Sequence, residues 1–377
     1  MLPSAPFTVP APPVDSLTSY RGRHLKIVAR ILLDWPSPLP GWLARTYQQV
    51  RPALAECFRA SPGAFYSALS LPTVAAPACG ADLLAAVPQL LVELARQRAL
   101  PEGGVFWGAP VSRLVVPALA VARRFESPRV GMLFGNGVVT VSPTEEWVLA
   151  PGEGGAWPLA EGGWLLGADT NPLAMMELHP DKSGNALDFG QATPAEWVAS
   201  IDRARARVAR YLPALAAEHR TLLAGIVPVG QHGEKSLSAS YKEAIGLAYL
   251  SLHPSSLTMT EALVHEVQHT KANLLSWSDP LVENSDERYP SPVRPDPRPL
   301  WGVLLAVHAF LPVALIHRAM YQSGDPEHDP GRYREVLQVN HDGMEVLRAH
   351  ARPTPLGRQL VDGMDALEAA FWAEANG

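Results

Sequence analysis

Cysteine and charge are both scarce in this 377-residue chain, and each scarcity excludes a class of protein. The two cysteines, Cys57 and Cys79, are too few for a disulfide framework and have no metal-ligand spacing. Charged residues make up 18% of the chain, the net charge is −6, and there is no dense run of lysine and arginine. A metal site must therefore use histidine and carboxylate ligands, and nucleic acid is not an expected partner.

Two kinds of segment are also missing from the sequence. No uninterrupted apolar run reaches about 18 residues, so no membrane span and no membrane partner are expected. The first residues, 1–14, are rich in proline and alanine but lack the basic and apolar parts of a secretory signal. We therefore expect a loose proline-rich arm at this end and a cytoplasmic protein.

The hydrophobic residues, 47% of the chain, are numerous enough for a large core, and their spacing changes along the sequence. Residues 15–125 carry apolar residues at helical spacing, which predicts an N-terminal helical region. Residues 128–190 and 226–252 contain short β-prone runs that predict strands. We expect residues 126–377 to form a metal-binding catalytic region. The predicted fold is α+β and predominantly α-helical, with a small antiparallel sheet packed against metal-bearing helices.

Several features mark the elements of the C-terminal region. Thr258 and Glu261 have the spacing of a capping box, which predicts a helix over residues 258–277. A proline-rich loop is expected over residues 279–299. An apolar helix and two amphipathic helices are then expected over residues 300–375.

The predicted 258–277 helix carries the motif His265-Glu266-Val267-Gln268-His269. Residues four apart lie on the same face of a helix, so His265 and His269 can bind one metal ion. Glu266 follows the first histidine and is a candidate general base. The alternative is a pair of exposed histidines with an ordinary acidic neighbour. The helical context and the apolar residues around the motif favour the metal site.

Two histidines need a third protein ligand, and the sequence leaves several candidates open. Ala272 and Leu275 stand where the extended zinc-peptidase motif has glycine and histidine, so that subclass is excluded. A thermolysin-like site would use a glutamate roughly 20 residues downstream, which keeps Glu283 and Glu287 in play. His308 is the third candidate, because an imidazole in an apolar helix needs a partner to offset its burial.

Three segments resemble the HExxH-type peptide-modifying family that is found beside genes for ribosomally made peptide natural products. The first is Ser251 to His269, and the second is Arg294-Pro-Asp-Pro-Arg298-Pro-Leu-Trp-Gly302. The third consists of Asp169-Thr-Asn-Pro-Leu173 together with His179-Pro-Asp-Lys182-Ser-Gly-Asn185. The resemblance covers roughly residues 165–320, and the N-terminal region contributes little to it.

This resemblance implies an iron(II)- and 2-oxoglutarate-dependent dioxygenase that hydroxylates the β-carbon of a side chain in a precursor peptide, using O₂. It implies His265 and His269 as iron ligands, and we assign His308 as the third. An oxygenase does not need Glu266 as a base, so this residue would orient ligands or water. All-histidine ligation departs from the usual set of two histidines and one carboxylate.

The 2-oxoglutarate that the resemblance implies has a distal carboxylate, which needs a cation and is best matched by a bidentate arginine. Arg298 and Arg294, just before the expected helix with His308, are the first candidates, and Lys242 is the next. The competing interpretation of Arg298 is an ion pair with Asp296.

Two other classes of function stay open. The first is a zinc-dependent peptidase or hydrolase, with Glu266 activating a metal-bound water and Glu283 or Glu287 completing the site. The second is a non-catalytic, peptide-binding component of a biosynthetic complex. The identity of the third ligand and the effect of Glu266→Gln distinguish the hydrolase from the oxygenase.

Overall fold

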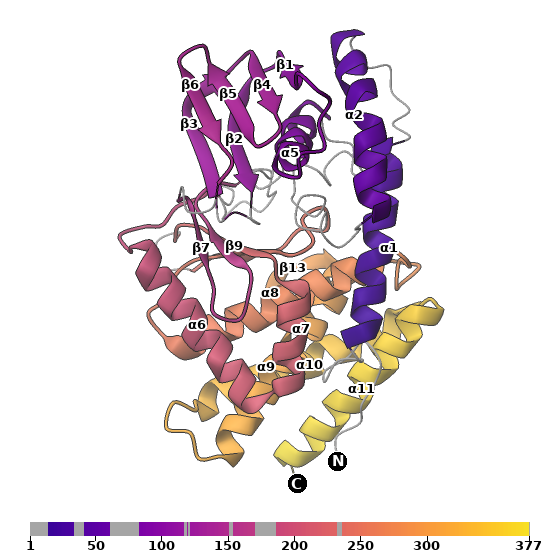
Figure 1. The fold of residues 1–377 in the computed structure, drawn as a ribbon. Helices are drawn as coiled ribbons and strands as arrows, with labels where there is room; N and C mark the ends of the chain where they lie inside the picture. Colours follow the sequence, from indigo (N-terminus) through magenta and orange to yellow (C-terminus); the bar gives the residue numbers. More distant parts are fainter. Residues whose placement is uncertain are drawn as a thin grey trace. The chain divides into compact units, whose positions relative to one another are not determined.

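The structure is a computed structural model with an α+β fold that is predominantly helical, as the sequence predicts (Figure 1). It describes residues 14–33, 41–60, 83–116, 119, 121–150, 154–169, 186–231 and 236–376. Residues 1–13 of the arm expected over residues 1–14, and the resembling residues 170–185 with His179, Lys182 and Asn185, lie outside this part. Val14, the last residue of the expected arm, begins helix α1 (Val14–Leu33). The chain forms two compact units, and each is discontinuous in sequence.

Unit 1 comprises residues 1–21, 199–223 and 253–377, and it is built of helices around one core. Its described helices and one two-stranded sheet are, in chain order, the first part of α1, most of α6 (Pro194–Tyr211), α7 (Pro213–Leu222), α8 (Ser256–Ser276), β12 (Arg288–Ser291), β13 (Arg294–Pro299), α9 (Leu300–Gln322), α10 (Pro330–His350) and α11 (Pro355–Asn376). The apolar helix α9 packs against α8, α10 and α11, and α7 packs against α8. This packing fixes the helix that carries the His-Glu-x-x-His motif.

Helix α8 begins two residues earlier than the sequence predicts. Ser255 is its N-cap, and the Ser255 hydroxyl accepts a hydrogen bond from the backbone N–H of Thr258 at 3.2 Å. The prediction of a capping box from Thr258 to Glu261 is therefore wrong. A serine N-cap satisfies one of the free N–H groups of the first turn equally well, which leaves Glu261 available for contacts with other helices.

Helix α9 is a buried core helix. Among the described residues it is the helix that is long and apolar enough to cross a membrane, but 78% of its most apolar stretch is buried inside the protein. Helix α10 approaches α9 closely, because a β-carbon at Gly343 would come within 2.4 Å of the Val307 side chain. The apolar character of α9 therefore reflects its burial among neighbouring helices.

Unit 2 comprises residues 22–198 and 224–252 and combines helices with small sheets. Among its described residues, the helices are the rest of α1, α2 (Gly41–Ala60), α5 (Leu83–Arg96) and the first residues of α6. An antiparallel sheet has the order β1-β4-β5-β6, formed by β1 (Val105–Trp107), β4 (Met132–Gly135), β5 (Val138–Ser142) and β6 (Glu145–Val148). Trp107 and Trp147 are fully buried in its core.

Two further sheets lie in the described part of unit 2. A hairpin pairs β2 (Val111–Val116) with β3 (Val121–Arg129). A mixed sheet has the order β10-β11-β9-β8-β7, formed by β7 (Ala156–Pro158), β8 (Trp164–Leu166), β9 (Gly225–Pro228), β10 (Ser238–Ala239) and β11 (Leu247–Leu250). Here β9 runs parallel to both β8 and β11.

The structure corrects three expectations from the sequence. Strands begin at Val105, so the expected helical region over residues 15–125 ends too late. The expected loop over residues 279–299 contains the β12–β13 hairpin. The expected single catalytic region over residues 126–377 is shared between the two units, and the strands of residues 128–190 and 226–252 belong to unit 2.

Candidate metal centre

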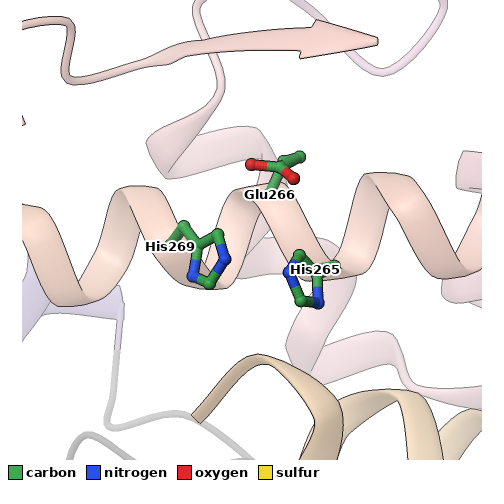
Figure 2. A group of neighbouring side chains, drawn as sticks. All are labelled: His265, Glu266 and His269. Carbon is green, nitrogen blue, oxygen red and sulfur yellow. The ribbon is translucent and has the colours of Figure 1, made fainter. Parts of the chain in front are cut away.

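Helix α8 presents His265 and His269 on the same face, one turn apart (Figure 2). Their ring centroids lie 4.3 Å apart at an interplanar angle of 75°. The Glu266 carboxylate lies one position further around the helix and is buried. One ligand atom from each of these three residues lies within 4.8 Å of the other two. Within the described part of the chain, this is the group of His, Cys, Asp and Glu side chains that could hold a metal ion.

Both imidazoles are kept neutral by their surroundings. Burial, together with the neighbouring His269, lowers the pKa of His265 to about 3. Burial also lowers the pKa of His269 to about 4. A metal ion binds the unprotonated imidazole. At neutral pH both histidines are already unprotonated, so no proton has to be released before the metal binds.

The Nδ1 atom of His269 also indicates that the motif can hold a metal ion. It is buried, and among the described residues it has no hydrogen-bond partner. A buried polar nitrogen without a partner costs free energy, which a bound cation or water would recover. The donor set of two neutral imidazoles and one carboxylate therefore fits a transition metal such as iron(II) or zinc.

Phe310 of α9 lies against the histidine pair. Its ring centroid is 4.8 Å from that of His265, at an interplanar angle of 67°. An apolar ring at this position excludes water from one side of the imidazole and limits its rotation. Phe310 is not predictable from the sequence, because a single aromatic residue in an apolar helix does not indicate which neighbouring helix it faces.

His308 is not part of the group around His265. It is buried in α9, two residues before Phe310, and two residues turn a helix by about 200°. Since Phe310 faces His265, His308 points to nearly the opposite side of α9. Val307, its neighbour in sequence, faces α10 at Gly343. The assignment of His308 as third ligand thus stays a prediction that no described contact supports.

Glu283 and Glu287, the other candidates for the third ligand, are also outside this group. Both are exposed, and Glu287 accepts hydrogen bonds from the Tyr289 hydroxyl at 2.6 Å and from Arg352 at 2.6 Å. These bonds, with one from Asn284, lower the pKa of Glu287 to about 2. Glu287 is therefore engaged in a surface network that links β12 to the end of α10.

The three candidate partners of a 2-oxoglutarate carboxylate lie in different places. Arg298, in β13, pairs with Asp296 at 3.7 Å, as its competing interpretation predicts. Arg294 is half-buried at the start of the same strand. About 15 Å of helix axis separate the start of α9, next to Arg298, from Phe310 at the histidine pair. Lys242 belongs to unit 2.

The first residue of the third resembling segment, Asp169, is buried in unit 2. It accepts a hydrogen bond from the Tyr249 hydroxyl at 2.9 Å. This bond ties the residues directly after β8 to β11. We therefore interpret Asp169 as a residue that stabilises the packing within unit 2.

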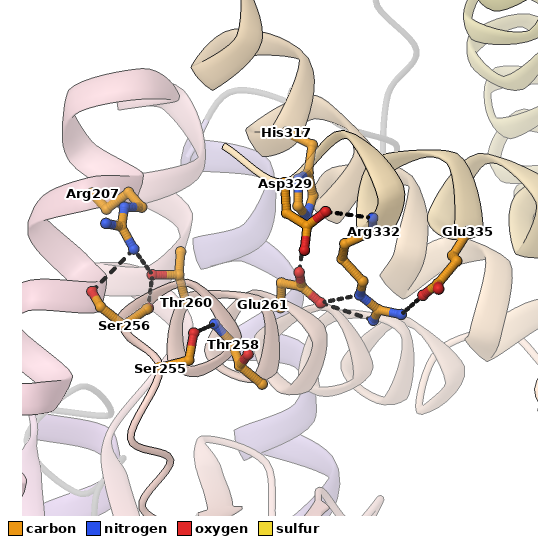
Figure 3. A network of polar contacts seen from close by, with 10 residues as sticks. All are labelled: Arg207, Ser255, Ser256, Thr258, Thr260, Glu261, His317, Asp329, Arg332 and Glu335. Atoms are coloured by element: carbon orange, nitrogen blue, oxygen red, sulfur yellow. Dashed lines mark hydrogen bonds and ion pairs between the residues drawn. The ribbon is translucent and has the colours of Figure 1, made fainter. Parts of the chain in front are cut away.

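Glu261 forms a network of contacts between helices that the sequence does not predict (Figure 3). It lies four residues before His265, so it occupies the same face of α8 one turn earlier. Its carboxylate accepts a hydrogen bond from His317 Nε2 of α9 at 2.8 Å and two from Arg332 of α10 at 2.8 and 2.9 Å. Asp329 caps α10 by accepting from the Arg332 backbone N–H. Glu261 thus ties α8 to α9 and α10, one helical turn before His265.

We expect the Glu261 network to make stability depend on pH in the acid range. Burial raises the pKa of Glu261, but hydrogen bonds from His317 and Arg332 outweigh burial and lower that pKa below its ordinary value of 4.5. A lowered pKa in the folded state stabilises the fold above the ordinary pKa, and this contribution is lost as the pH falls below it.

Urea unfolding of wild type and Glu261→Gln at pH 7 and pH 3.5 measures this effect. The variant should lose about 1.5–3 kcal/mol of unfolding free energy at pH 7, the range for hydrogen bonds to charged groups, and clearly less at pH 3.5. Glu335→Gln is the matched control, because Glu335 also bonds Arg332, at 3.2 Å, but is exposed. An equal loss of unfolding free energy at both pH values, or an equal loss in the control, would contradict the stabilising role of the ionised Glu261 carboxylate.

A second buried polar cluster lies on another face of α8. Lys271 pairs with Glu218 of α7 at 2.5 Å, and both side chains are fully buried. The Gln268 side-chain amide donates to the other Glu218 oxygen at 3.0 Å. Burial, then the positive charges of Arg205 and Lys271, lower the pKa of the adjacent His219 to about 3. These contacts fix the rotation of α8 and so the direction in which its histidines point.

A search against models of known protein families finds no match for this sequence, and curated proteins provide none either.

Proposed function

We propose that the protein is an iron(II)- and 2-oxoglutarate-dependent oxygenase that hydroxylates the β-carbon of a side chain in a ribosomally made precursor peptide. The observation that carries the proposal is the group of His265, Glu266 and His269 on one capped, tightly packed helix. The resemblance of three segments to the HExxH-type peptide-modifying family supports iron and 2-oxoglutarate over other metal chemistry.

The chain's own residues would bind and orient the metal. His265 and His269 are neutral and lie one turn apart on a rigid helix, so they can hold the metal without rearrangement. The Glu266 carboxylate can accept a hydrogen bond from a group bound beside them and so fix its orientation. Phe310 keeps water from one side of His265.

Iron(II) and 2-oxoglutarate, when bound, supply with O₂ the oxidation that converts a C–H bond of the peptide into C–OH and releases succinate and CO₂.

The proposed cation for the distal carboxylate of 2-oxoglutarate is Arg298, with Arg294 and Lys242 as further candidates. Arg298→Lys keeps the charge but loses the bidentate geometry, so the KM for 2-oxoglutarate should rise in this variant. An unchanged KM for 2-oxoglutarate would remove Arg298 from the proposal. We place the reaction in the cytoplasm.

A zinc-dependent hydrolase is the second candidate, and the position of Glu266 favours it. A carboxylate within 4.8 Å of both histidines can take the proton from a metal-bound water. This candidate needs Glu283 or Glu287 as third ligand, and neither belongs to the group. A non-catalytic peptide-binding role predicts instead that removing the metal leaves peptide affinity unchanged.

Glu266→Gln separates the two enzymes. In the oxygenase Glu266 only orients other groups, so hydroxylation should fall by about 10- to 100-fold and not disappear. In the hydrolase it is the general base, and its loss should cost about 10²- to 10⁴-fold with the metal retained. The readout is peptide mass, which distinguishes the gain of one oxygen atom from cleavage, with metal content measured for both proteins.

A further inference from the structure

A groove runs between two helices of unit 2, far in sequence from the metal motif. It has a volume of about 540 Å³ and is lined by Lys26, Ala29, Arg30, Leu33, Gln48, Arg51, Pro52, Ala55 and Phe58. The first four belong to α1 and the other five to α2. Five of these residues are exposed, so the groove is open to solvent.

The floor of the groove is apolar. Ala29 and Leu33 are four residues apart on α1, and Ala55 and Phe58 are three apart on α2, so each pair lies on one helix face. Ala29 is buried and the other three are partly buried. A groove with apolar residues from two helices is the kind of surface that the apolar face of an amphipathic segment covers.

The rim of the groove is basic. Lys26, Arg30 and Arg51 are exposed, and no carboxylate is among the lining residues that the structure describes. Arg51 also donates a hydrogen bond from Nε to the Leu33 backbone oxygen at 2.7 Å, which fixes its guanidinium at the rim. Together α1 and α2 contain seven lysine and arginine residues but only two acidic ones. The whole chain carries a net charge of −6, so this positive surface is a local reversal of the overall charge. Such a surface attracts an acidic partner and repels a basic one.

We propose that this groove binds an acidic amphipathic peptide segment. Its apolar residues would lie on Ala29, Leu33, Ala55 and Phe58, and its carboxylates would pair with Lys26, Arg30 and Arg51. A nucleic acid fits less well, because three cations on an acidic protein are few compared with the 6–10 phosphate contacts of nucleic-acid binders. The apolar floor also has no hydrogen-bond donors or positive charges for a phosphate backbone. The proposal does not depend on the metal centre.

Fluorescence anisotropy with the full-length protein tests this proposal. The probe is a labelled synthetic helix of leucine and glutamate at amphipathic spacing, and the reference probe has lysine in place of every glutamate. We expect the glutamate peptide to bind and the lysine peptide not to bind. The double variant Lys26→Glu with Arg30→Glu should weaken binding by about tenfold or more at low salt, since two attractions become repulsions.

Two variants control for folding and for general electrostatics. Lys26→Glu alone changes one exposed rim residue and should weaken binding by a smaller factor. Arg358→Glu makes the same charge change at an exposed residue of α11 and should leave binding unchanged. EDTA should also leave it unchanged, which separates this site from the metal centre. Equal weakening by Arg358→Glu, equal binding of the two peptides, or displacement of the peptide by single-stranded oligothymidylate or phosphatidylserine vesicles would overturn the proposal.

Discussion

Replacing either His265 or His269 with alanine will remove metal binding. Each variant keeps only one imidazole of a pair whose possible ligand atoms, with those of Glu266, lie within 4.8 Å of one another. Loss of residues that only support a ligand already costs about 10- to 100-fold in affinity, so loss of a ligand should cost more than about 100-fold. Metal content after dialysis against iron(II) or zinc, measured by mass spectrometry, gives the result directly.

His350→Ala is the matched control for this experiment. His350 is exposed at the end of α10 and stacks on Tyr289, so its loss removes an imidazole from the same unit without touching α8. The control should retain the metal stoichiometry of wild type. Retained metal in His265→Ala or His269→Ala, or equal loss in His350→Ala, would show that the motif does not bind the metal.

Lys271→Met will produce the largest loss of stability among the predicted variants. It leaves the Glu218 carboxylate fully buried without its cation, and breaking a buried ion pair in this way costs about 3–5 kcal/mol. Methionine keeps most of the volume of lysine, so the effect measures charge and not packing. Urea unfolding followed by far-UV circular dichroism gives the change in unfolding free energy.

The double variant Lys271→Met with Glu218→Leu tests the cause of that loss. Removing both charges from a buried pair is often neutral or stabilising, so the double variant should recover most of the stability lost by Lys271→Met. The Gln268 amide, which donates to Glu218, would lose that acceptor, so recovery should be incomplete. A loss below about 1 kcal/mol in Lys271→Met would contradict the importance of this pair, because it lies in the range of exposed pairs.

The local structure of helix α8 around the His-Glu-x-x-His motif was predictable from the sequence. Helical spacing places His265 and His269 on one face, and the structure confirms that placement. The bounds of the three helices expected over residues 300–375 are confirmed within a residue or two. They were predictable because apolar spacing and the prolines at the start of α10 and α11 are local signals.

The contacts between helices were not predictable. Glu261 has the spacing of a capping residue to Thr258, and only the approach of α9 and α10 brings His317 and Arg332 to it. His308 looks like a ligand because it is buried in an apolar helix, but the rotation of α9 decides which side it faces. That rotation depends on long-range packing, such as the close approach of Gly343 to Val307.

Two strand regions were missed for reasons that lie in their own sequences. The burial of β2 does not alternate, and its pairing with β3 shifts register between Val111 and Arg113, so the two-residue period is broken. The β12–β13 hairpin contains several prolines, which normally indicate a loop. A two-stranded sheet tolerates them, because each strand has one edge that needs no N–H donors.

The most direct test of the proposed function is an anaerobic titration of the metal-free protein with iron(II) and 2-oxoglutarate. Wild type should develop the visible charge-transfer band of an iron-bound 2-oxo acid, and His265→Ala and His269→Ala should not. The absence of this band in wild type, with tight stoichiometric binding of zinc instead, would contradict the oxygenase and favour the hydrolase.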